Sequence, residues 1–182
     1  DLKQQPDGGF SISRSTTDPR RTGQALVQLD DDFEEVSRHE TVGLTNTDGH
    51  DSIVLPDGTI WLLAYEPNAQ TGLVDSIIQR LDPDGSVGFE WTSAPYVDDT
   101  VTPDDPEYAH VNSIDLMDDG SILASFRGFS SVFKIDTSTP TGSVVWKLGG
   151  VDSSFAITDA AGAPDSGPCA QHTARELEDG SI

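Results

Sequence analysis

The sequence predicts an all-β protein built from repeated units of four short antiparallel strands. Three segments share one pattern: a histidine, a short alternating run, an Asp-Gly turn and, where the chain continues, a second β-rich run. They begin at His50, His110 and His172, which lie 60 and 62 residues apart. Asp-Gly between alternating apolar runs is a strong hairpin signal, because glycine accepts the positive φ of a tight turn. No stretch combines a 3.6-residue apolar period with helix caps, and residues 34–40 come nearest but are too short.

The strands can be assigned in order along the chain. Residues 10–15 and 24–29 are expected strands with a turn at 30–33, and the first eight residues end in the same Pro-Asp-Gly as residues 51–58. Residues 60–65 carry apolar side chains on both faces, so we expect this strand to be covered on both sides. Residues 76–91 and 130–148 each indicate strand, polar turn, strand, with Trp91 and Trp146 in corresponding places.

Units of about sixty residues that bury their faces against neighbours are typical of β-propeller blades. A β-sandwich would explain the strands, but not the near-constant interval between the histidine and Asp-Gly units. We therefore expect a β-propeller fragment with four-stranded antiparallel blades, cut off at both ends within its repeats. Residues 1–182 would be one partial propeller domain, divided into an incomplete blade (1–49), a blade (50–109), a blade with a connecting loop (110–171) and the start of the next blade (172–182).

The charge excludes several kinds of partner. Thirty-two acidic residues against ten basic ones give a net charge of −22, which repels nucleic acid and anionic membranes. The acidity fits either a high-salt habitat or simply a soluble surface. No apolar run is long enough to span a membrane. Cys169 is the single cysteine, so no internal disulfide can form, and Cys169 with His172 alone would make a poor zinc site.

The repeated histidines are the first candidates for chemistry. Equivalent positions on successive blades face the same way, so we expect His50, His110 and His172 to converge on one axial pocket. The competing interpretation is that each histidine hydrogen-bonds a loop carbonyl, because buried polar groups need partners. The fourth histidine, His39, lies in a polar connecting segment and is expected at the surface.

Two further residues favour a functional interpretation. Asn112 lies two positions beyond His110 and shares its strand face. Arg127 stands seven residues after the turn glycine, where the preceding unit has Tyr65. Imidazoles with an arginine and an asparagine suit an oxyanion of one negative charge. They lack the carboxylates that magnesium-dependent phosphate chemistry prefers.

These residues resemble the arylsulfotransferase family, the PAPS-independent enzymes built on a six-bladed propeller. The resemblance rests on H-x-N-S-I at 110–114, the downstream Arg127, TG-x-x-x-W-x-L-GG at 141–150 and the Gln171-His172 pair. It covers residues 50–182 well and the first 49 loosely. A looser similarity to quinoprotein propellers, through TG-x-x-x-W, does not by itself indicate a quinone cofactor.

The resemblance implies a role for each matching residue. His172 would be the nucleophile that is transiently sulfurylated, and His50 would lie near the phenolic oxygen. His110, Asn112 and Arg127 would hold the sulfuryl oxygens and assist proton transfer. Apart from the resemblance, we expect Asn112 and Tyr65 to bind substrate. The expected reaction moves a sulfuryl group from a phenolic sulfate ester to a phenol, without a cofactor. Members of the family are typically exported, so the same is expected of this protein.

Two other interpretations remain open at this point. Propellers are common interaction platforms, so the chain could be a non-catalytic propeller that binds a ligand or protein partner. The histidines could also ligate a transition metal in the channel, although a nearby Arg127 would be unfavourable there. Convergence of His50, His110, Arg127 and His172 on one pocket would favour the enzyme over the binding module.

Overall fold

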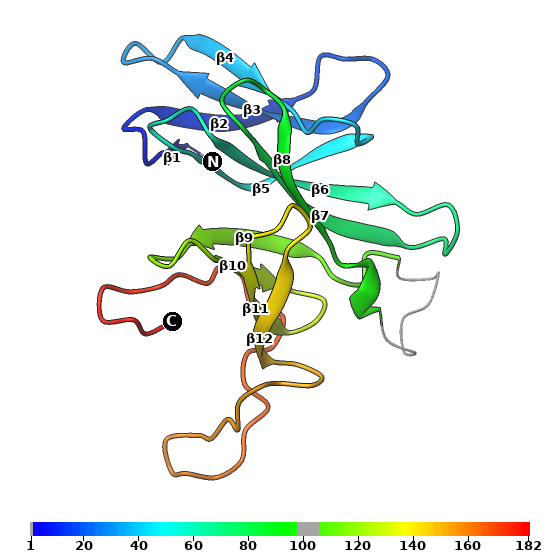
Figure 1. The fold of residues 1–182 in the computed structure, drawn as a ribbon, viewed down its shortest axis with the longest axis vertical. Coiled ribbons are helices and arrows are strands. Elements are labelled where there is room, and N and C mark those ends of the chain that lie inside the picture. Colours follow the sequence, from blue (N-terminus) through cyan, green and yellow to red (C-terminus); the bar gives the residue numbers. More distant parts are fainter. Residues whose placement is uncertain (1, 98–105) are drawn as a thin grey trace.

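The computed structural model describes residues 2–97 and 106–182, which form three successive antiparallel meanders of four strands each (Figure 1). A short parallel pairing of residues 22–23 with residues 46–47 joins the first two meanders into one eight-stranded sheet, and the third meander is a separate four-stranded sheet. Unit 1 contains β1 (Lys3–Gln4), β2 (Phe10–Ser15), β3 (Thr22–Leu29) and β4 (Glu35–His39). Unit 2 contains β5 (Asn46–Val54), β6 (Ile60–Pro67), β7 (Val74–Leu81) and β8 (Val87–Thr92), followed by the short 3-10 helix η1 (Ala94–Tyr96). Unit 3 contains β9 (Val111–Leu116), β10 (Ile122–Phe126), β11 (Ser131–Asp136) and β12 (Ser143–Gly149). The predicted all-β class is confirmed.

The same turn follows the first strand of each unit and recurs in the C-terminal segment. In the second of these turns, the Leu55 N–H donates to the Thr59 carbonyl and the Gly58 N–H donates to the Leu55 carbonyl, both at 2.9 Å. The equivalent pair of hydrogen bonds closes the turns at residues 5–9, 117–121 and 177–181. The glycine of each turn has φ between +79° and +91°, which residues with a Cβ rarely adopt. The predicted Asp-Gly turns are thus confirmed, and they fix the register between the repeats.

Both faces of β6 are covered, as its sequence predicts. On one face, Ile60 and Leu62 pack against Leu26 of unit 1. On the other, Trp61 and Leu63 belong to the large cluster that includes Phe133 and other residues of unit 3. Burial of large apolar side chains stabilises by about 1.5–3 kcal/mol each. The second unit is therefore held between the other two by its hydrophobic faces.

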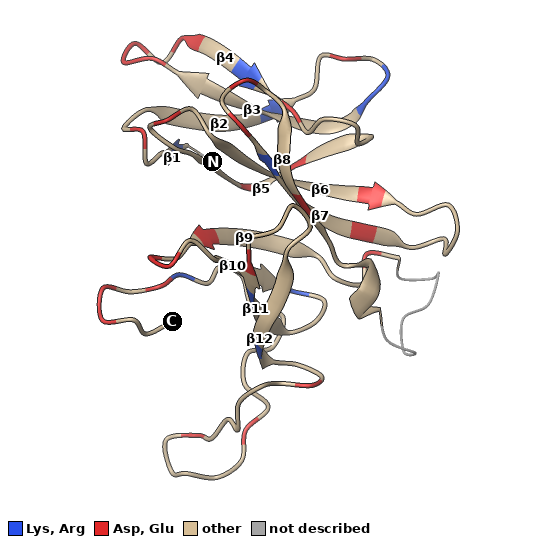
Figure 2. Cartoon of the chain, in the orientation of Figure 1, with Lys and Arg blue, Asp and Glu red and all other residues tan. Residues whose placement is uncertain are grey.

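Strand direction places the loops at two opposite edges. The Asp-Gly turns join β5 to β6 and β9 to β10 at one edge. The opposite edge, which we call the site edge, is where the odd-numbered strands of units 2 and 3 begin and the even-numbered strands end. It carries η1 and the β10–β11 turn (residues 127–130). Acidic residues are spread over all three units, while Lys and Arg are few (Figure 2).

Two expectations about residues of the strands are wrong. His39 does not lie in a connecting segment at the surface: it belongs to β4, is half-buried, and its Nε2 lies 2.9 Å from Gln28 Oε1. Burial lowers the pKa of His39. Trp91 and Trp146 are also not equivalent, because Trp146 pairs with Lys134 where Phe89 pairs with Arg80. The chain between these paired positions is three residues longer in unit 3 (12 residues, 134 to 146) than in unit 2 (9 residues, 80 to 89).

Within the described residues, no helix is both long and apolar enough to cross a membrane.

Candidate functional site

Three histidines from separate repeats meet at the site edge. The ring centroid of His50 lies 5.2 Å from that of His110 and 5.9 Å from that of His172. These side chains come from β5, from the residue before β9 and from the segment that follows β12. The predicted convergence of the three histidines is therefore found in the structure.

Irregular backbone conformations at His50 and His110 set the direction of their side chains. Asp48 pairs with Leu63 and Ser52 pairs with Leu62, so three residues centred on His50 bulge out of the β5–β6 ladder. Bulges re-aim side chains and are common beside active sites. His110 has φ of +54°, a left-handed conformation that is uncommon for a residue other than glycine. Neither feature can be read from the alternation of the strands.

The three histidines are not at equivalent positions of the repeat, contrary to the expectation from the sequence. Counted from the turn glycines Gly58, Gly120 and Gly180, His50 and His172 each lie eight residues upstream, and the residue at that position in unit 3 is Asn112. His110 lies two residues further upstream. The three histidines therefore do not share one repeat position, and His110 joins the cluster through its left-handed backbone.

Asn112 fixes the segment that carries His172. It lies where Val111 pairs with Phe126 and Ser113 with Ser125, so it bulges from β9, and it is fully buried. Its Nδ2 donates to the Gln171 carbonyl at 2.8 Å, and its Oδ1 accepts from the Thr173 N–H at 3.5 Å. The amide thus holds the backbone on both sides of His172.

Further contacts keep this segment along β9. The Ala174 N–H donates to Ser113 Oγ at 3.1 Å, and the Gln171 side chain donates to Ser125 Oγ at 3.1 Å. Thr173 has φ of +76°, a marked outlier for a β-branched residue. Such backbone persists only where the surroundings impose it, and it concentrates at functional sites.

All three imidazoles use Nδ1 for their polar contact. Nδ1 of His50 lies 2.7 Å from Asp48 Oδ1, and Nδ1 of His110 lies 3.4 Å from Glu107 Oε2. Nδ1 of His172 lies 3.0 Å from the hydroxyl of Thr173. Among the residues that the structure describes, Nε2 of each ring makes no hydrogen bond or ion pair, which leaves it available for chemistry.

The carboxylates beside the rings set the charge of the cluster. The hydrogen bond to Asp48 raises the pKa of His50; burial opposes this, while the negative charges of Asp48 and Glu107 add to it. The side chains of His50 and His110 are 33% and 24% exposed, so both rings are reached by solvent. Asp48 and Glu107 were not predicted from the sequence. The available signal was that Asp48 lies only two residues before His50.

Tyr65 packs against two of the histidines. Its ring centroid lies 5.9 Å from that of His50 and 5.4 Å from that of His110. Its hydroxyl donates to the Val111 carbonyl at 2.6 Å and lies 3.3 Å from Nδ1 of His50. Burial, followed by the charges of Asp48 and Glu107, raises the pKa of Tyr65, so the phenol stays neutral. Tyr65 thus forms one wall of the cluster.

Arg127 is tied to the cluster by its backbone. Its N–H donates to the His110 carbonyl at 3.0 Å, at the start of the β10–β11 turn. Its side chain is exposed, and among the described residues its guanidinium makes no hydrogen bond or ion pair. The structure thus places Arg127 next to His110 but leaves its guanidinium free to meet an anion. Its role stays a prediction.

A cavity of about 300 Å³ adjoins the histidines. Asp48, Tyr65 and Glu107, which contact the imidazoles, line it together with Gly23 and Asn46. Small-molecule sites start at about this size. Within residues 2–97 and 106–182, no group of three His, Cys, Asp or Glu side chains has an arrangement suited to a metal ion.

The geometry can be compared with known families. The model of a family described as arylsulfotransferase (ASST) matches residues 20–181. No curated protein gives a match.

Proposed function

Because the chain belongs to the arylsulfotransferase family, we propose that it moves a sulfuryl group from a phenolic sulfate ester to a phenol through a sulfo-histidine on His172. The observation that carries the proposal is the meeting of His50, His110 and His172, with Nδ1 of each ring already engaged. The convergence also favours an enzyme over a non-catalytic binding module. In this scheme the donor is the aryl sulfate itself, and PAPS is not required.

We propose further that the units are blades of a β-propeller. Three similar meanders follow one another along the chain, and units 2 and 3 share a hydrophobic core. Residues 171–176 hydrogen-bond to β9, and β9 hydrogen-bonds to β5, so the first segments of successive units lie next to one another. The blades would comprise residues 1–49, 50–109 and 110–171, with 172–182 beginning the next. Blades arranged around an axis bring equivalent residues together at its centre.

In the first half-reaction, Nε2 of His172 attacks the sulfur of the aryl sulfate. The N–S bond forms as the S–O bond to the aryl group breaks, and the phenolate leaves with the bonding electron pair. His50 donates a proton from Nε2 to the phenolate oxygen. Phenols have a pKa of about 10, so their departure benefits from a general acid. The contact with Asp48 favours the protonated form of His50 that this step requires.

In the second half-reaction, an acceptor phenol enters. Nε2 of His50, now neutral, takes the phenolic proton as the phenol oxygen attacks the sulfur. The N–S bond breaks and its electron pair returns to His172, which regenerates the starting enzyme. Two half-reactions through one nucleophile give ping-pong kinetics. His50 ends protonated, ready for the next donor.

The remaining residues would stabilise and position the reacting group. Negative charge on the peripheral sulfuryl oxygens calls for fixed cationic donors, and Arg127 offers a planar fork for two of them. Nε2 of His110 would donate to another of these oxygens. The contacts of Asn112 support a positioning role through the backbone of His172.

The decisive experiment follows phenol release from an aryl sulfate whose phenol is coloured, with and without an acceptor phenol. We expect release to depend on the acceptor and to fall by at least about 10³-fold in His172→Asn. A sulfurylated peptide containing His172 should be trapped from donor alone and identified by mass spectrometry. His39→Asn is the matched control, because His39 is half-buried in β4 and outside the cluster.

Full activity in folded His172→Asn would exclude this histidine as the nucleophile.

The family resemblance also leads us to propose that the protein is exported. Cell fractionation followed by detection with an antibody tests this proposal.

A further inference from the structure

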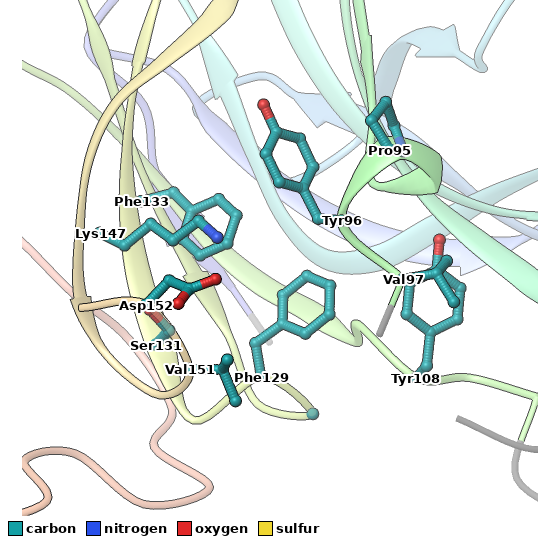
Figure 3. Close-up of a pocket in the computed structure, with 11 residues that line it drawn as sticks. Pro95, Tyr96, Val97, Tyr108, Phe129, Ser131, Phe133, Lys147, Val151 and Asp152 are labelled. Carbon is teal, nitrogen blue, oxygen red and sulfur yellow. The ribbon is translucent and has the colours of Figure 1, made fainter. Parts of the chain in front are cut away.

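A second cavity, of about 390 Å³, lies at the site edge between η1 and unit 3 (Figure 3). Four aromatic side chains contribute to its lining: Tyr96, Tyr108, Phe129 and Phe133. None of the three clustered histidines lines it. Since an apolar cavity of about 150 Å³ already holds benzene, this one is large enough for one or two fused rings. We call it the aromatic pocket.

The walls of the aromatic pocket are held in place by contacts to one another. The rings of Phe129 and Phe133 are stacked at 5.6 Å and 5°, and Tyr96 meets Phe133 edge-on at 5.6 Å. The hydroxyl of Tyr108 donates to Asp75 at 2.6 Å, and its oxygen lies 2.7 Å from Ser93 Oγ. Flat surfaces fixed in this way suit a planar ligand, because little freedom remains to be lost on binding.

Lys147 brings a positive charge into this pocket. Its Nζ lies 5.3 Å from the centroids of both Tyr96 and Phe133, and Figure 3 shows its side chain extending across the Phe133 ring. The other two lysines, Lys3 and Lys134, each pair with an aspartate at 2.5 Å. Among the described residues, no carboxylate lies within 4.0 Å of the Lys147 ammonium. In a chain of net charge −22, a cation held by rings instead of a carboxylate leaves its charge available to a ligand.

The charges of the other lining groups are compatible with an anion. Burial, and then the hydrogen bond to Asp75, raises the pKa of Tyr108, so this phenol stays neutral. Asp152 also lines the aromatic pocket, but it is exposed to solvent, where its charge is screened.

We propose that the aromatic pocket binds a planar aromatic anion, with its ring against Phe129 and Tyr96 and its acidic group on Lys147. The ligand class is one or two fused rings that carry a sulfonate, sulfate or carboxylate group. Stacking supplies apolar contact, and the ammonium selects for the negative charge. The site is distinct from the histidine cluster and does not depend on sulfuryl transfer.

The test is a calorimetric titration of the whole protein with 2-naphthalenesulfonate, an aryl sulfonate that has no ester oxygen to leave. We expect saturable binding that Lys147→Met weakens by about tenfold or more, as expected for the loss of one charge-assisted hydrogen bond. Lys134→Met is the matched control, because it removes the same charge from the neighbouring strand and should leave binding unchanged. Neutral 2-naphthol should bind more weakly and be indifferent to Lys147→Met.

A second pair of variants separates this site from the histidines. Phe129→Leu keeps the pocket apolar but removes the flat surface, and we expect weaker binding of both probes. His172→Asn should bind 2-naphthalenesulfonate as the wild type does, whether or not the proposed transfer reaction is correct. Equal affinity in the two lysine variants, or binding lost in His172→Asn and retained in Lys147→Met, would overturn the proposal.

Discussion

The carboxylate of Asp51 lies 3.0 Å from the guanidinium of Arg175, although 124 residues separate them in sequence. The same carboxylate accepts from Nζ of Lys3 at 2.5 Å and from the N–H of Ile114 at 3.0 Å. The Asp51 side chain is only 5% exposed. One buried group therefore joins units 1, 2 and 3 to the C-terminal segment, directly beside His50.

We expect Asp51→Asn to lower the free energy of unfolding by about 1.5–3 kcal/mol, the range for hydrogen bonds to charged groups. The loss stays moderate because Lys3 and Arg175 are about one-third exposed and can be hydrated. Urea denaturation measures the change. Asp119→Asn, which removes the exposed pair with Lys134, should have a smaller effect. Equal effects of the two substitutions would show that Asp51 does not join the units energetically.

The pH dependence of the reaction should report the pairing of His50 with Asp48. The first half-reaction needs protonated His50, so its rate should fall as pH rises through the pKa of that residue. Asp48→Asn removes the largest cause of the raised pKa, so the fall should begin at lower pH. At neutral pH the rate should drop by up to about 10²-fold. Single-turnover rates measured across pH test this.

Glu107→Gln provides the comparison for Asp48→Asn. The charge of Glu107 raises the pKa of His50 less than Asp48 does. The pH profile of Glu107→Gln should therefore move to lower pH by less than that of Asp48→Asn. A pH profile unchanged in Asp48→Asn would mean that His50 is not the general acid.

Loss of the Asn112 side chain should displace His172. Asn112→Ala leaves the Gln171 carbonyl and the Thr173 N–H without their partner, at a cost of about 1–3 kcal/mol in stability. The rate of sulfuryl transfer should fall by more than the loss of folded protein explains. Activity and thermal melting, measured on the same samples, test this. Asn68→Ala, in the β6–β7 loop, should leave transfer intact. Wild-type transfer by folded Asn112→Ala would contradict the positioning role.

Substitution of Arg127 should lower kcat/KM for the donor aryl sulfate more than kcat/KM for the acceptor phenol. In Arg127→Gln we expect kcat/KM for the aryl sulfate to fall by about 10- to 10²-fold, which corresponds to one charge-assisted hydrogen bond. The kcat/KM of Arg127→Lys should lie between those of the wild type and Arg127→Gln, since lysine keeps the charge but lacks the planar guanidinium fork. The melting temperature should hardly change, because the side chain is exposed and the hydrogen bond to His110 comes from the backbone.

Arg20→Gln is the control for Arg127→Gln. Arg20 is also exposed, and it pairs with Asp18, whose pKa this contact lowers to about 2. It lies in the β2–β3 loop, outside the histidine cluster. Equal loss of activity in both variants would indicate a general effect of charge instead of a contact to the donor.

The sequence by itself determined the local parts of this protein. The Asp-Gly pairs predicted the turns, because positive φ is a property of a few residues and their immediate neighbours. Apolar residues on both faces of 60–65 predicted a strand covered on both sides. The repeat predicted that His50 and His172, which share a repeat position, would meet, whereas His110 lies two residues outside that position.

Only the tertiary structure decided how that meeting is arranged. The bulge at His50, the left-handed backbone of His110 and the clamp of Asn112 on the His172 segment arise from contacts between strands that are far apart in sequence. The same holds for the pairing of Asp51 with Arg175. Alternation along a strand fixes which face a side chain takes. Bulges and buried ion pairs depend on the neighbouring strand, so no local pattern could assign them.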